Sequence, residues 1–536
     1  MFSPQKRLIY SGLLLIILAT VAIRLPLLEV PLERDEGEYA YAGQLILQGI
    51  PPYIGIYSMK LPGIYGIYAL IMAAFGQTPK GIHLGLLFIN IATIIMIFFL
   101  AQKLINSIAG ISSAACFAFL SIGRSVQGIF ANSEHFVIYF VLCSSLLLVH
   151  GRKNNKTLPI FLSGIFAGSS FLVKQNGIAF IAFGAIYILT QKYSDTSISL
   201  KQIIYNELFF IIGAILPYLL TMAYFYHIGI FDKFRFWTFD YAMTYATLVP
   251  PSIAWKIFFR NVVPIVISSP AIWIVSFSGL IAVLAGYKKL GFDINYFILF
   301  NIFSFIAICP GFYFRPHYFI LILPAVSIMF GIGATVLSDQ IGKIYRFNHN
   351  NTLAILIVLI CISTSLYRQY TFLLQLTPSQ ASRFTYGLNP FPESIELGDI
   401  IQKITQKEDR IAVLGSEPQI YFYSKRRAAT GYVYMYPLME QHNFAKQMQI
   451  EMVHEIEKSE PEILIFVNVY TSWLKYPNSH QYIFEWFNDY KKYYRTLGLI
   501  ELRMDKTFYH WIPDLDWPPK SSTWLLIMKR KNKKSF

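Results

Sequence analysis

Long runs of apolar residues, rather than alternating apolar and polar positions, fill most of the first 370 residues of this 536-residue chain. A bilayer core of roughly 30 Å requires about 20 apolar residues in a helix. Stretches that approach this length lie near residues 8–28, 82–102, 108–123, 134–150, 157–173, 175–191, 206–227, 262–286, 292–309, 317–337 and 352–370. The pattern predicts a polytopic α-helical membrane protein with about eleven transmembrane helices.

One further apolar segment, Leu61 to Phe75, is not counted among these spans. It follows Lys60 and contains Pro62 and two glycines, Gly63 and Gly66. Such a segment favours a re-entrant or interfacial helix over a regular span.

After residue 370 the pattern changes. Residues 409–415 and 462–467 are typical of short buried strands, and residues 447–458 follow a helical pattern. We therefore expect a transmembrane domain over residues 1–370, with its first outside loop at 29–81, and a soluble α/β domain over 371–536.

The positive charges suggest an orientation in the membrane. Short loops on the side of the N-terminus carry clusters such as Arg152, Lys153 and Lys156, and positive charge concentrates in cytoplasmic loops. We expect a multi-pass protein of the plasma (inner) membrane, with a cytoplasmic N-terminus and an extracytoplasmic C-terminal domain.

Composition agrees with this interpretation. The chain is 55% hydrophobic and only 14% charged, which excludes a string of soluble domains. The net charge of +15 is not arranged as a basic stripe with exposed aromatics, so we expect no nucleic-acid partner. The four cysteines all lie in apolar stretches without metal-ligand spacing, so no disulfide frame or zinc site is expected.

The candidate chemistry begins just after the first span, at residues 33–38. Ionisable groups beside a membrane are costly unless they have a function. The carboxylate of Asp35 is the predicted general base, with Glu36 in support and Glu38 solvated, while Arg34 has no assigned role. The alternative for Asp35 is the N-cap of a following helix. A second acid, Glu134, follows the third span on the same side, and a helix cap is its alternative as well.

Basic side chains on the same side are candidates for binding an anion. Arg315 can bind phosphate through two charge-assisted hydrogen bonds, and Lys60 offers a point charge. The alternative for Lys174 is that its side chain snorkels, so that the ammonium reaches the membrane interface. The alternative for His317 is a histidine at the interface whose hydrogen bonds are made within the protein. Together with the acids, these groups suit a reaction between a lipid-linked phosphate and a hydroxyl or amine acceptor.

Six short motifs occur in one order along residues 8–340: residues 34–40, 49–53, 60–63, 132–134, 172–175 and 315–318. In this order and spacing the chain resembles the GT-C glycosyltransferases. The likeness is greatest to the bacterial branch similar to protein O-mannosyltransferases and aminoarabinose transferases (ArnT-like).

The resemblance implies inverting transfer of a sugar from a polyprenyl-phosphate donor to a lipid, glycan or protein acceptor. It implies that Asp35 is the catalytic base or orients the acceptor, that Glu36 supports the motif, and that Glu134 is the second acid near the acceptor. The residues expected at the donor phosphate are Lys60, Arg315, Lys174 and His317. The chain departs from many relatives at Gly63, where they carry proline or an aromatic residue, and at Glu134, where they carry aspartate.

No cofactor is required by this chemistry, although Asp35, Glu36 and Glu134 are acids that a divalent ion accepts as ligands. Two alternative functions remain. A flippase or transporter of lipid-linked sugars would place charges at the bilayer midplane and show inverted halves, and neither is evident. A surface-polysaccharide polymerase or ligase would also use outside acids and arginines, but the Asp35-Glu36 pair directly after the first span favours the transferase.

Overall fold

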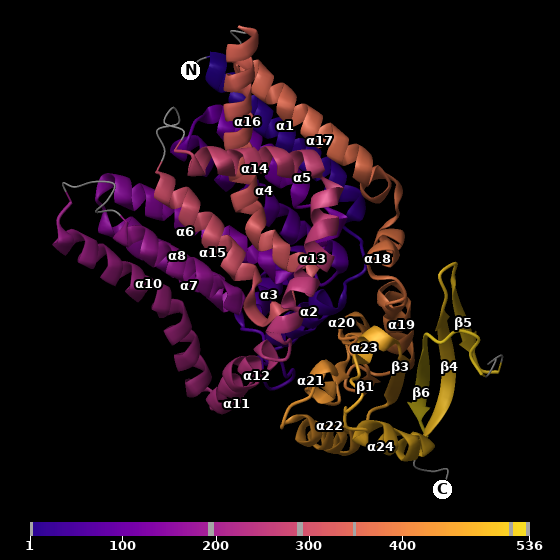
Figure 1. Cartoon of the computed structure of the whole chain (residues 1–536). Coiled ribbons are helices and arrows are strands. Elements are labelled where there is room, and N and C mark those ends of the chain that lie inside the picture. Colours follow the sequence, from indigo (N-terminus) through magenta and orange to yellow (C-terminus); the bar gives the residue numbers. More distant parts are fainter. Residues whose placement is uncertain (1–3, 191–197, 287–292, 347–349, 514–517, 532–536) are drawn as a thin grey trace.

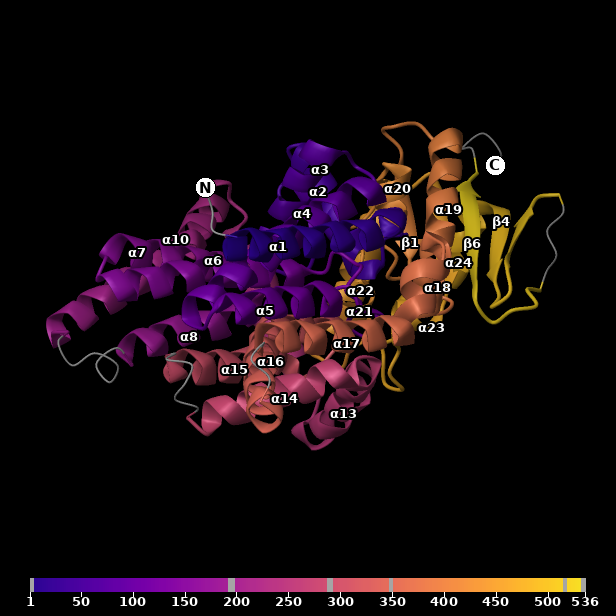
Figure 2. The ribbon, with the colours of Figure 1, turned by 90° about the horizontal axis from the view of Figure 1, so that it is seen from above.

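The computed structural model describes residues 4–190, 198–286, 293–346, 350–513 and 518–531. Residues 191 and 292, at the ends of two predicted spans, lie outside these ranges. Figure 1 shows a large helical region with an α/β domain at one end and the start of the chain at the other end. Figure 2 shows that the α/β domain is offset to one side of the helical region.

Long apolar helices form the helical region. In the described part of the chain, six helices are long and apolar enough to cross a membrane. They are centred on α1 (Pro4–Arg24), α4 (Pro79–Leu104), α6 (Ser133–Asn154), α10 (Leu200–His227), α16 (Leu323–Tyr345) and α17 (Asn350–Tyr370). Shorter apolar helices lie between them, namely α5 (Ser107–Leu120), α7 (Thr157–Val173), α8 (Ile178–Leu189) and α15 (Ile294–Ile308). The protein is therefore a multi-pass membrane protein, and the number of eleven spans stays a prediction.

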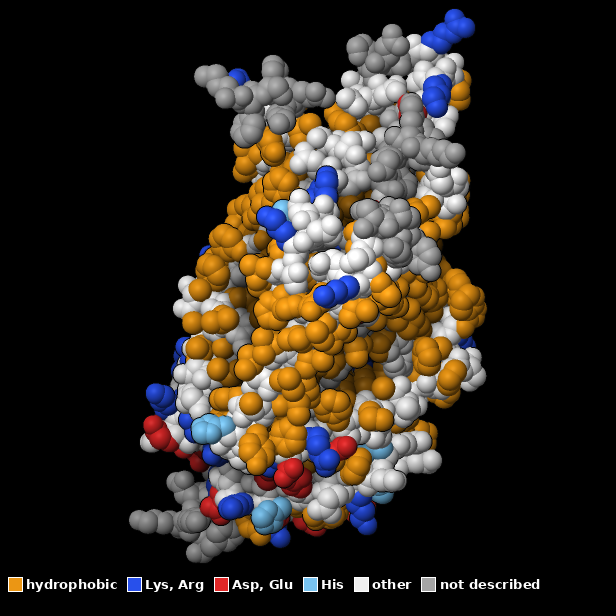
Figure 3. Space-filling model, turned by 90° about the vertical axis from the view of Figure 1, so that its left-hand side faces the viewer, with side chains coloured by type: hydrophobic (Ala, Val, Ile, Leu, Met, Phe, Trp, Pro, Cys, Tyr) orange, Lys and Arg blue, Asp and Glu red, His pale blue; other side chains and the backbone are white. Residues whose placement is uncertain are grey.

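The surface agrees with a position in lipid. Figure 3 shows a broad band of hydrophobic side chains over the middle of the face that carries α10, with charged side chains toward its ends. The exposed hydrophobic residues of α10 include Leu208, Ile212, Leu219 and Leu220. A water-soluble protein rarely exposes so large an apolar surface.

One predicted span is broken. Residues 262–286 were expected to form one span, and the structure has two helices there, α13 (Pro251–Ser268) and α14 (Pro270–Leu284), which meet at 104°. The apolar pattern did not predict this bend. Pro270 has no N–H to donate and its ring clashes with the preceding turn, so a helix cannot continue through it without a break.

The segment before the second span forms α3 (Gly63–Phe75). Its 13 residues extend about 20 Å, less than the roughly 30 Å of a bilayer core. Helix α3 packs against α2 (Arg34–Leu47) and α4. The interfacial or re-entrant placement of this segment stays a prediction.

The C-terminal domain is built on a six-stranded sheet, with the strand order β2-β1-β3-β6-β4-β5. Strand β1 runs parallel to β2 and β3, while β6 and β5 pair antiparallel with their neighbours. The strands are β1 (Arg410–Leu414), β2 (Arg427–Ala428), β3 (Ile463–Asn468), β4 (Tyr494–Leu502), β5 (Thr507–Trp511) and β6 (Trp524–Arg530). The two strands predicted from the sequence, at 409–415 and 462–467, are confirmed as β1 and β3.

Seven helices of this domain are described as well. They are α18 (Pro378–Tyr386), α19 (Phe391–Ile404), α20 (Gln419–Ser424), α21 (Tyr436–Met439), α22 (Ala445–Ser459), α23 (Tyr470–Trp473) and α24 (Tyr482–Tyr490). The helix predicted at 447–458 is α22. The short connecting helices of the described chain are η1 (Leu25–Leu27), η2 (Arg124–Val126), η3 (Gln175–Gly177), α11 (Phe231–Arg235), η4 (Phe236–Tyr241), α12 (Ala242–Ala246), η6 (Pro310–Phe312), η7 (Pro316–Ile322), η8 (Thr371–Gln375) and η9 (Lys491–Tyr493).

The two parts of the molecule are packed tightly where α2 meets α20. A Cβ atom on Gly37 of α2 would lie 2.6 Å from the backbone nitrogen of Gln419, so only glycine allows this approach. The rings of Tyr41 and Tyr421 meet nearby, with their centroids 5.3 Å apart. The segment that carries Asp35 is thus held directly against the C-terminal domain.

Candidate active site

A cavity of about 440 Å³ lies where α2, the loop before α3, the ends of several apolar helices and the C-terminal domain meet. Of the seven residues predicted from the sequence, five line this cavity: Asp35, Lys60, Lys174, Arg315 and His317. The other two, Glu36 and Glu134, have no exposed surface and lie behind the lining residues. Segments from four distant parts of the sequence therefore converge on one site.

Asp35 lies in the first turn of α2. The N-cap of this helix is Glu33, whose carboxylate accepts hydrogen bonds from the backbone N–H groups of Asp35 and Glu36 at 3.0 and 3.1 Å. The alternative interpretation of Asp35 as the cap is therefore wrong. Because Glu33 satisfies the helix terminus, the Asp35 carboxylate is free to face the cavity.

The Asp35 carboxylate is surrounded by donors. Its Oδ1 accepts hydrogen bonds from Lys60 Nζ at 2.8 Å and from the Tyr434 hydroxyl at 2.6 Å. Its Oδ2 lies 4.0 Å from Nε2 of His317. Burial alone would raise the pKa of Asp35, but the charges of Lys60, His317 and Arg315 outweigh burial and hold that pKa well below its usual range. The group is therefore an ionised carboxylate near neutral pH.

Lys60 is shared between two carboxylates. Its Nζ also lies 2.7 Å from Oε2 of Glu38, whose Oε1 accepts a hydrogen bond from the Tyr65 hydroxyl at 2.6 Å. Burial lowers the pKa of Lys60, but Asp35 and Glu38 more than reverse this and raise it. The prediction that Glu38 is solvated was wrong, because its side chain is 1% exposed and paired. Its position one helical turn from Asp35 places it on the same face of α2.

Glu36 ties α2 to the membrane helices. One of its oxygens accepts a hydrogen bond from the Glu33 N–H at 3.1 Å, and the other lies 2.8 Å from Nε2 of His83 on α4. The N–H of Ala131, in the loop before α6, also donates to it. These contacts fix the orientation of α2, and the supporting role of Glu36 stays a prediction.

Glu134, Lys174 and His317 form a second charged group. The Lys174 ammonium hydrogen-bonds to Glu134 and lies 4.1 Å from the centre of the Tyr318 ring. The snorkelling interpretation of Lys174 is wrong, because its charge is paired inside the protein. Glu134 is not the cap of α6 either, since Asn132 occupies that position. His317 Nε2 is 4.0 Å from both Glu134 and Asp35, so the histidine stands between the two acids.

Arg315 differs from the two lysines. Among the described residues its guanidinium forms no ion pair, and its polar contact is a 3.5 Å hydrogen bond to the Tyr245 hydroxyl. Its Cζ atom lies 5.6 Å from the centre of the Tyr313 ring. A half-buried guanidinium at a cavity wall, without a carboxylate partner among the described residues, favours an anionic ligand.

Gly63 explains one departure from the family pattern. A Cβ atom at this position would lie 2.5 Å from the backbone oxygen of Leu172. The backbone after Lys60 therefore touches the backbone just before Lys174. A larger residue would push the two lysines apart.

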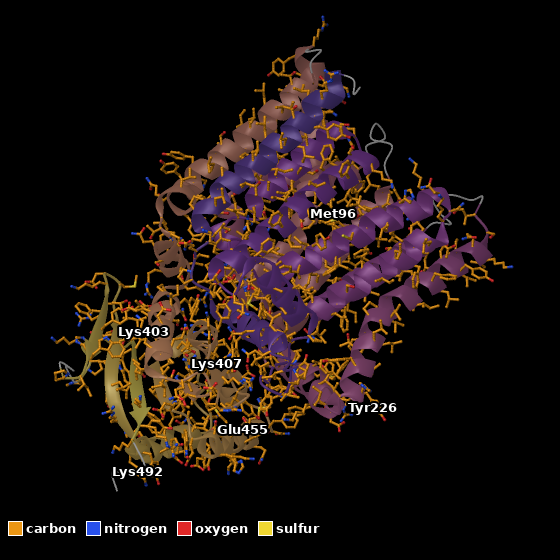
Figure 4. All side chains as sticks on the ribbon, turned by 180° about the vertical axis from the view of Figure 1, so that it is seen from behind. Met96, Tyr226, Lys403, Lys407, Glu455 and Lys492 are labelled. Carbon is orange, nitrogen blue, oxygen red and sulfur yellow. The ribbon has the colours of Figure 1, made fainter. Side chains whose placement is uncertain are left out.

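Arg34 holds the C-terminal domain to α2. Its guanidinium forms an ion pair of 2.5 Å with the fully buried Glu417 and donates to Asn389 Oδ1 at 2.9 Å and the Tyr436 hydroxyl at 3.0 Å. It also donates to the backbone oxygen of Ser416. A second contact between the two parts joins Tyr57 and Glu455. The Tyr57 hydroxyl donates a hydrogen bond of 2.7 Å to the carboxylate of Glu455 on α22, which Figure 4 labels.

The C-terminal domain supplies cavity residues that the sequence analysis missed: Tyr434, Tyr436 and Glu440. Burial raises the pKa of Glu440 to about 7, although Tyr241 and Arg315 oppose the rise. Three closely spaced tyrosines, at 432, 434 and 436, are visible in the sequence, and the second and third of them line the cavity. Glu440 carries no comparable signal.

The acids considered as metal ligands are not grouped. Within the described ranges, no three His, Cys, Asp or Glu side chains are arranged to hold one metal ion. Glu36 faces His83, while Glu134 is bonded to Lys174.

The chain has recognisable relatives. Residues 60–221, which include Lys60, Glu134 and Lys174, match the profile of the family described as dolichyl-phosphate-mannose-protein mannosyltransferase. No curated protein sequence matches the chain significantly. The similarity to solved structures extends much further than the profile match.

ArnT from Cupriavidus metallidurans in the apo state superposes with a TM-score of 0.61 at 13% identity, over 97% of this chain and 98% of ArnT. ArnT bound to undecaprenyl phosphate superposes with a TM-score of 0.60, with the same identity and coverage. The archaeal oligosaccharyltransferase AglB from Archaeoglobus fulgidus, in complex with an inhibitory peptide and a dolichol-phosphate, gives 0.54 at 12% identity, over 96% of this chain and 75% of AglB. The chain therefore has the fold of ArnT, and part of it also matches the mannosyltransferase profile.

Proposed function

We propose that the protein transfers a sugar from a polyprenyl-phosphate donor to a hydroxyl or amine of an acceptor at the outer face of the membrane, with inversion at the sugar. The observation that carries this proposal is the ionised Asp35 carboxylate, which faces the cavity within the field of Lys60, His317 and Arg315. A base beside an anion-binding group is the arrangement that such a transfer requires. The solved relatives that bind undecaprenyl phosphate or dolichol-phosphate support the same donor class.

The reaction is a single displacement. The acceptor oxygen or nitrogen attacks the anomeric carbon from the side opposite the phosphate and loses its proton to Asp35. The bond between the anomeric carbon and the phosphate oxygen breaks, and its electron pair leaves with polyprenyl phosphate. Because one displacement occurs, the anomeric configuration inverts.

Lys60 and Arg315 neutralise the charge that develops on the leaving phosphate. Lys60 lies 2.8 Å from Asp35, so a phosphate bound at its ammonium competes with the carboxylate for the same charge. This competition raises the pKa of Asp35 and makes it a better base. Binding of the donor therefore activates the general base in this mechanism.

The second charged group supports the first. Lys174 is a further cation for the phosphate, held in place by Glu134. The Nε2 atom of His317 lies 4.0 Å from a carboxylate oxygen of Asp35 and 4.0 Å from one of Glu134. In this mechanism the histidine links the two acids and keeps them in a fixed relative position. In this mechanism Glu134 acts near the acceptor side of the site without lining the cavity.

The test uses purified full-length protein in detergent, polyprenyl-phosphate hexoses and pentoses, and lipid, glycan and protein acceptors. We expect Asp35→Asn to slow release of polyprenyl phosphate by about 10² or more, the effect of removing a general base. Donor binding should persist. The matched control is Asp399→Asn, at an exposed site on α19, which should leave release unchanged.

Release that is equally fast in Asp35→Asn would refute the mechanism. Movement of the donor across a vesicle membrane without bond cleavage would instead support a flippase. Donor consumption that yields only chain elongation of a polysaccharide would support a polymerase.

A further inference from the structure

Glu440 is a buried acid of the cavity that the mechanism through Asp35 does not use. It follows α21 in the C-terminal domain and its side chain is 8% exposed. The Tyr241 hydroxyl donates a hydrogen bond to its Oε2 at 2.5 Å. Within the described part of the chain no hydrogen bond reaches Oε1, so this oxygen is available to a ligand in the cavity.

An aromatic surface lies beside this carboxyl group. Tyr245, which lines the cavity from α12, stacks on Tyr313 with ring centroids 4.5 Å apart and planes 11° from parallel. The hydroxyl of Tyr245 points to Arg315, at 3.5 Å. A flat aromatic face next to a hydrogen-bonding group suits a ligand with one apolar face and polar edges.

Charge decides which part of the donor occupies this end of the cavity. An anionic phosphate is repelled by a carboxylate and attracted by Lys60 and Arg315. The guanidinium of Arg315 opposes the rise that burial causes in the pKa of Asp35 and of Glu440, so it acts on both acids. With the phosphate at Lys60 and Arg315, the uncharged remainder of the donor's head group extends toward Tyr245 and Glu440.

We propose that Glu440 recognises the transferred sugar, with its free carboxyl oxygen hydrogen-bonded to one sugar hydroxyl while the ring of Tyr245 packs against the sugar face. This inference rests on the proposed function and adds the group that determines sugar specificity. A carboxyl group in either protonation state forms a hydrogen bond with a hydroxyl, because the hydroxyl both donates and accepts.

The consequence is discrimination between donors. A sugar that lacks the recognised hydroxyl leaves a buried carboxyl oxygen without a partner, which costs more than the lost contact alone. A donor with that hydroxyl removed should therefore bind far more weakly than its parent. Removing Glu440 should abolish the difference between the two.

The test measures donor affinity in full-length Asp35→Asn protein, so that no turnover interferes. The probes are polyprenyl-phosphate hexoses and pentoses together with each of their monodeoxy forms. We expect one monodeoxy donor to bind about tenfold to a hundredfold more weakly than its parent. In the same protein with Glu440→Ala, the two should bind equally, and Glu440→Gln should restore part of the difference.

Two further variants separate recognition from structure. Tyr241→Phe removes the partner of Oε2 but keeps the carboxyl group, so discrimination should persist. Glu408→Ala removes an exposed acid and should change nothing. Thermal unfolding of each variant shows whether the protein is folded.

Discrimination that survives in Glu440→Ala would overturn the inference and leave the role of Asp35 untouched. The same holds if Glu440→Ala weakens the binding of all donors by one factor, which is the result of a purely structural role. Failure of the protein to bind any donor would overturn the proposed function, and this inference with it.

Discussion

The two walls of the cavity differ in charge. Residues up to 318 contribute all the lining arginines and lysines among the described residues, namely Arg34, Lys60, Lys174 and Arg315, together with the acids Glu33, Asp35 and Glu38. The C-terminal domain contributes Tyr434, Tyr436, Thr471 and Leu474 to the other wall, with Glu440 as its one acidic lining residue among those described. One wall is therefore suited to a phosphate and the other to a neutral, hydroxyl-rich group.

The difference teaches that neither part forms the site alone. Asp35 takes a hydrogen bond from each wall, from Lys60 on one side and Tyr434 on the other. Arg34, directly before Asp35 in the sequence, is one of the residues that hold the walls together. Substitutions that separate the walls, or that remove one group from each, test this division.

The largest effect is expected from Arg34→Ala. The change leaves Glu417 buried without its cation, and breaking a buried ion pair in this way costs about 3–5 kcal/mol. We expect a lower free energy of unfolding. We also expect a loss of activity, although Asp35 is unchanged in this variant. Thermal unfolding and limited proteolysis in detergent measure the first effect.

The control for this change is Arg495→Ala, at an exposed position on β4. Arg34→Lys keeps the charge but not the forked geometry, so its effect should be intermediate. If Arg34→Ala is as stable and active as the control, the C-terminal domain is held by other contacts and the two walls are independent.

The second effect concerns the cation-rich wall. Arg315→Ala and Lys60→Ala should each weaken donor affinity, since a charge-assisted hydrogen bond contributes about 1.5–3 kcal/mol. Titration of a polyprenyl-phosphate donor against the Asp35→Asn protein measures this. Lys80→Ala, at the exposed start of α4, is the control. Unchanged donor affinity in both variants would mean that the donor phosphate does not bind at this wall.

A pH profile sharpens the role of Lys60. The base works only when ionised, and the cations keep the pKa of Asp35 well below its usual range. Activity is therefore lost through Asp35 only as the pH falls through that low pKa. In Lys60→Gln the largest opposing charge is gone while burial remains, so the pKa rises and the acid limb of kcat/KM moves to higher pH. Arg315→Gln should shift the limb less.

The same comparison explains what the sequence could predict. Charged residues beside apolar spans are costly, so Asp35, Lys60, Lys174 and Arg315 are visible in the sequence without any structure. The membrane class and strands β1 and β3 follow from apolar patterns. The break at Ser269 was not predicted, because the apolar run continues across Pro270 and the pattern alone does not show that the helix ends.

The groups of the second wall were missed for a different reason. Tyr434 meets Asp35 across 399 positions of the sequence, and its hydroxyl is one of many in a chain with 36 tyrosines. Glu440 lies in a soluble domain, where an acid costs nothing until folding buries it. Glu38 was assigned to solvent because its partners Lys60 and Tyr65 come from later segments. Contacts of this range require the tertiary fold.

The smallest effect is expected from Tyr434→Phe, which removes one O–H donor from Asp35 and keeps the ring. Lys60 still satisfies the same oxygen, so the loss should be about 0.5–1.5 kcal/mol, or roughly twofold to tenfold in kcat. Tyr470→Phe is the matched control, because that ring lies 76% exposed on α23 and its hydroxyl does not contact Asp35. A loss of a hundredfold or more in Tyr434→Phe alone would mean that this hydroxyl takes part in proton transfer. The tyrosine-rich wall would then belong to the chemistry itself, and the division between a phosphate wall and a sugar wall would fail.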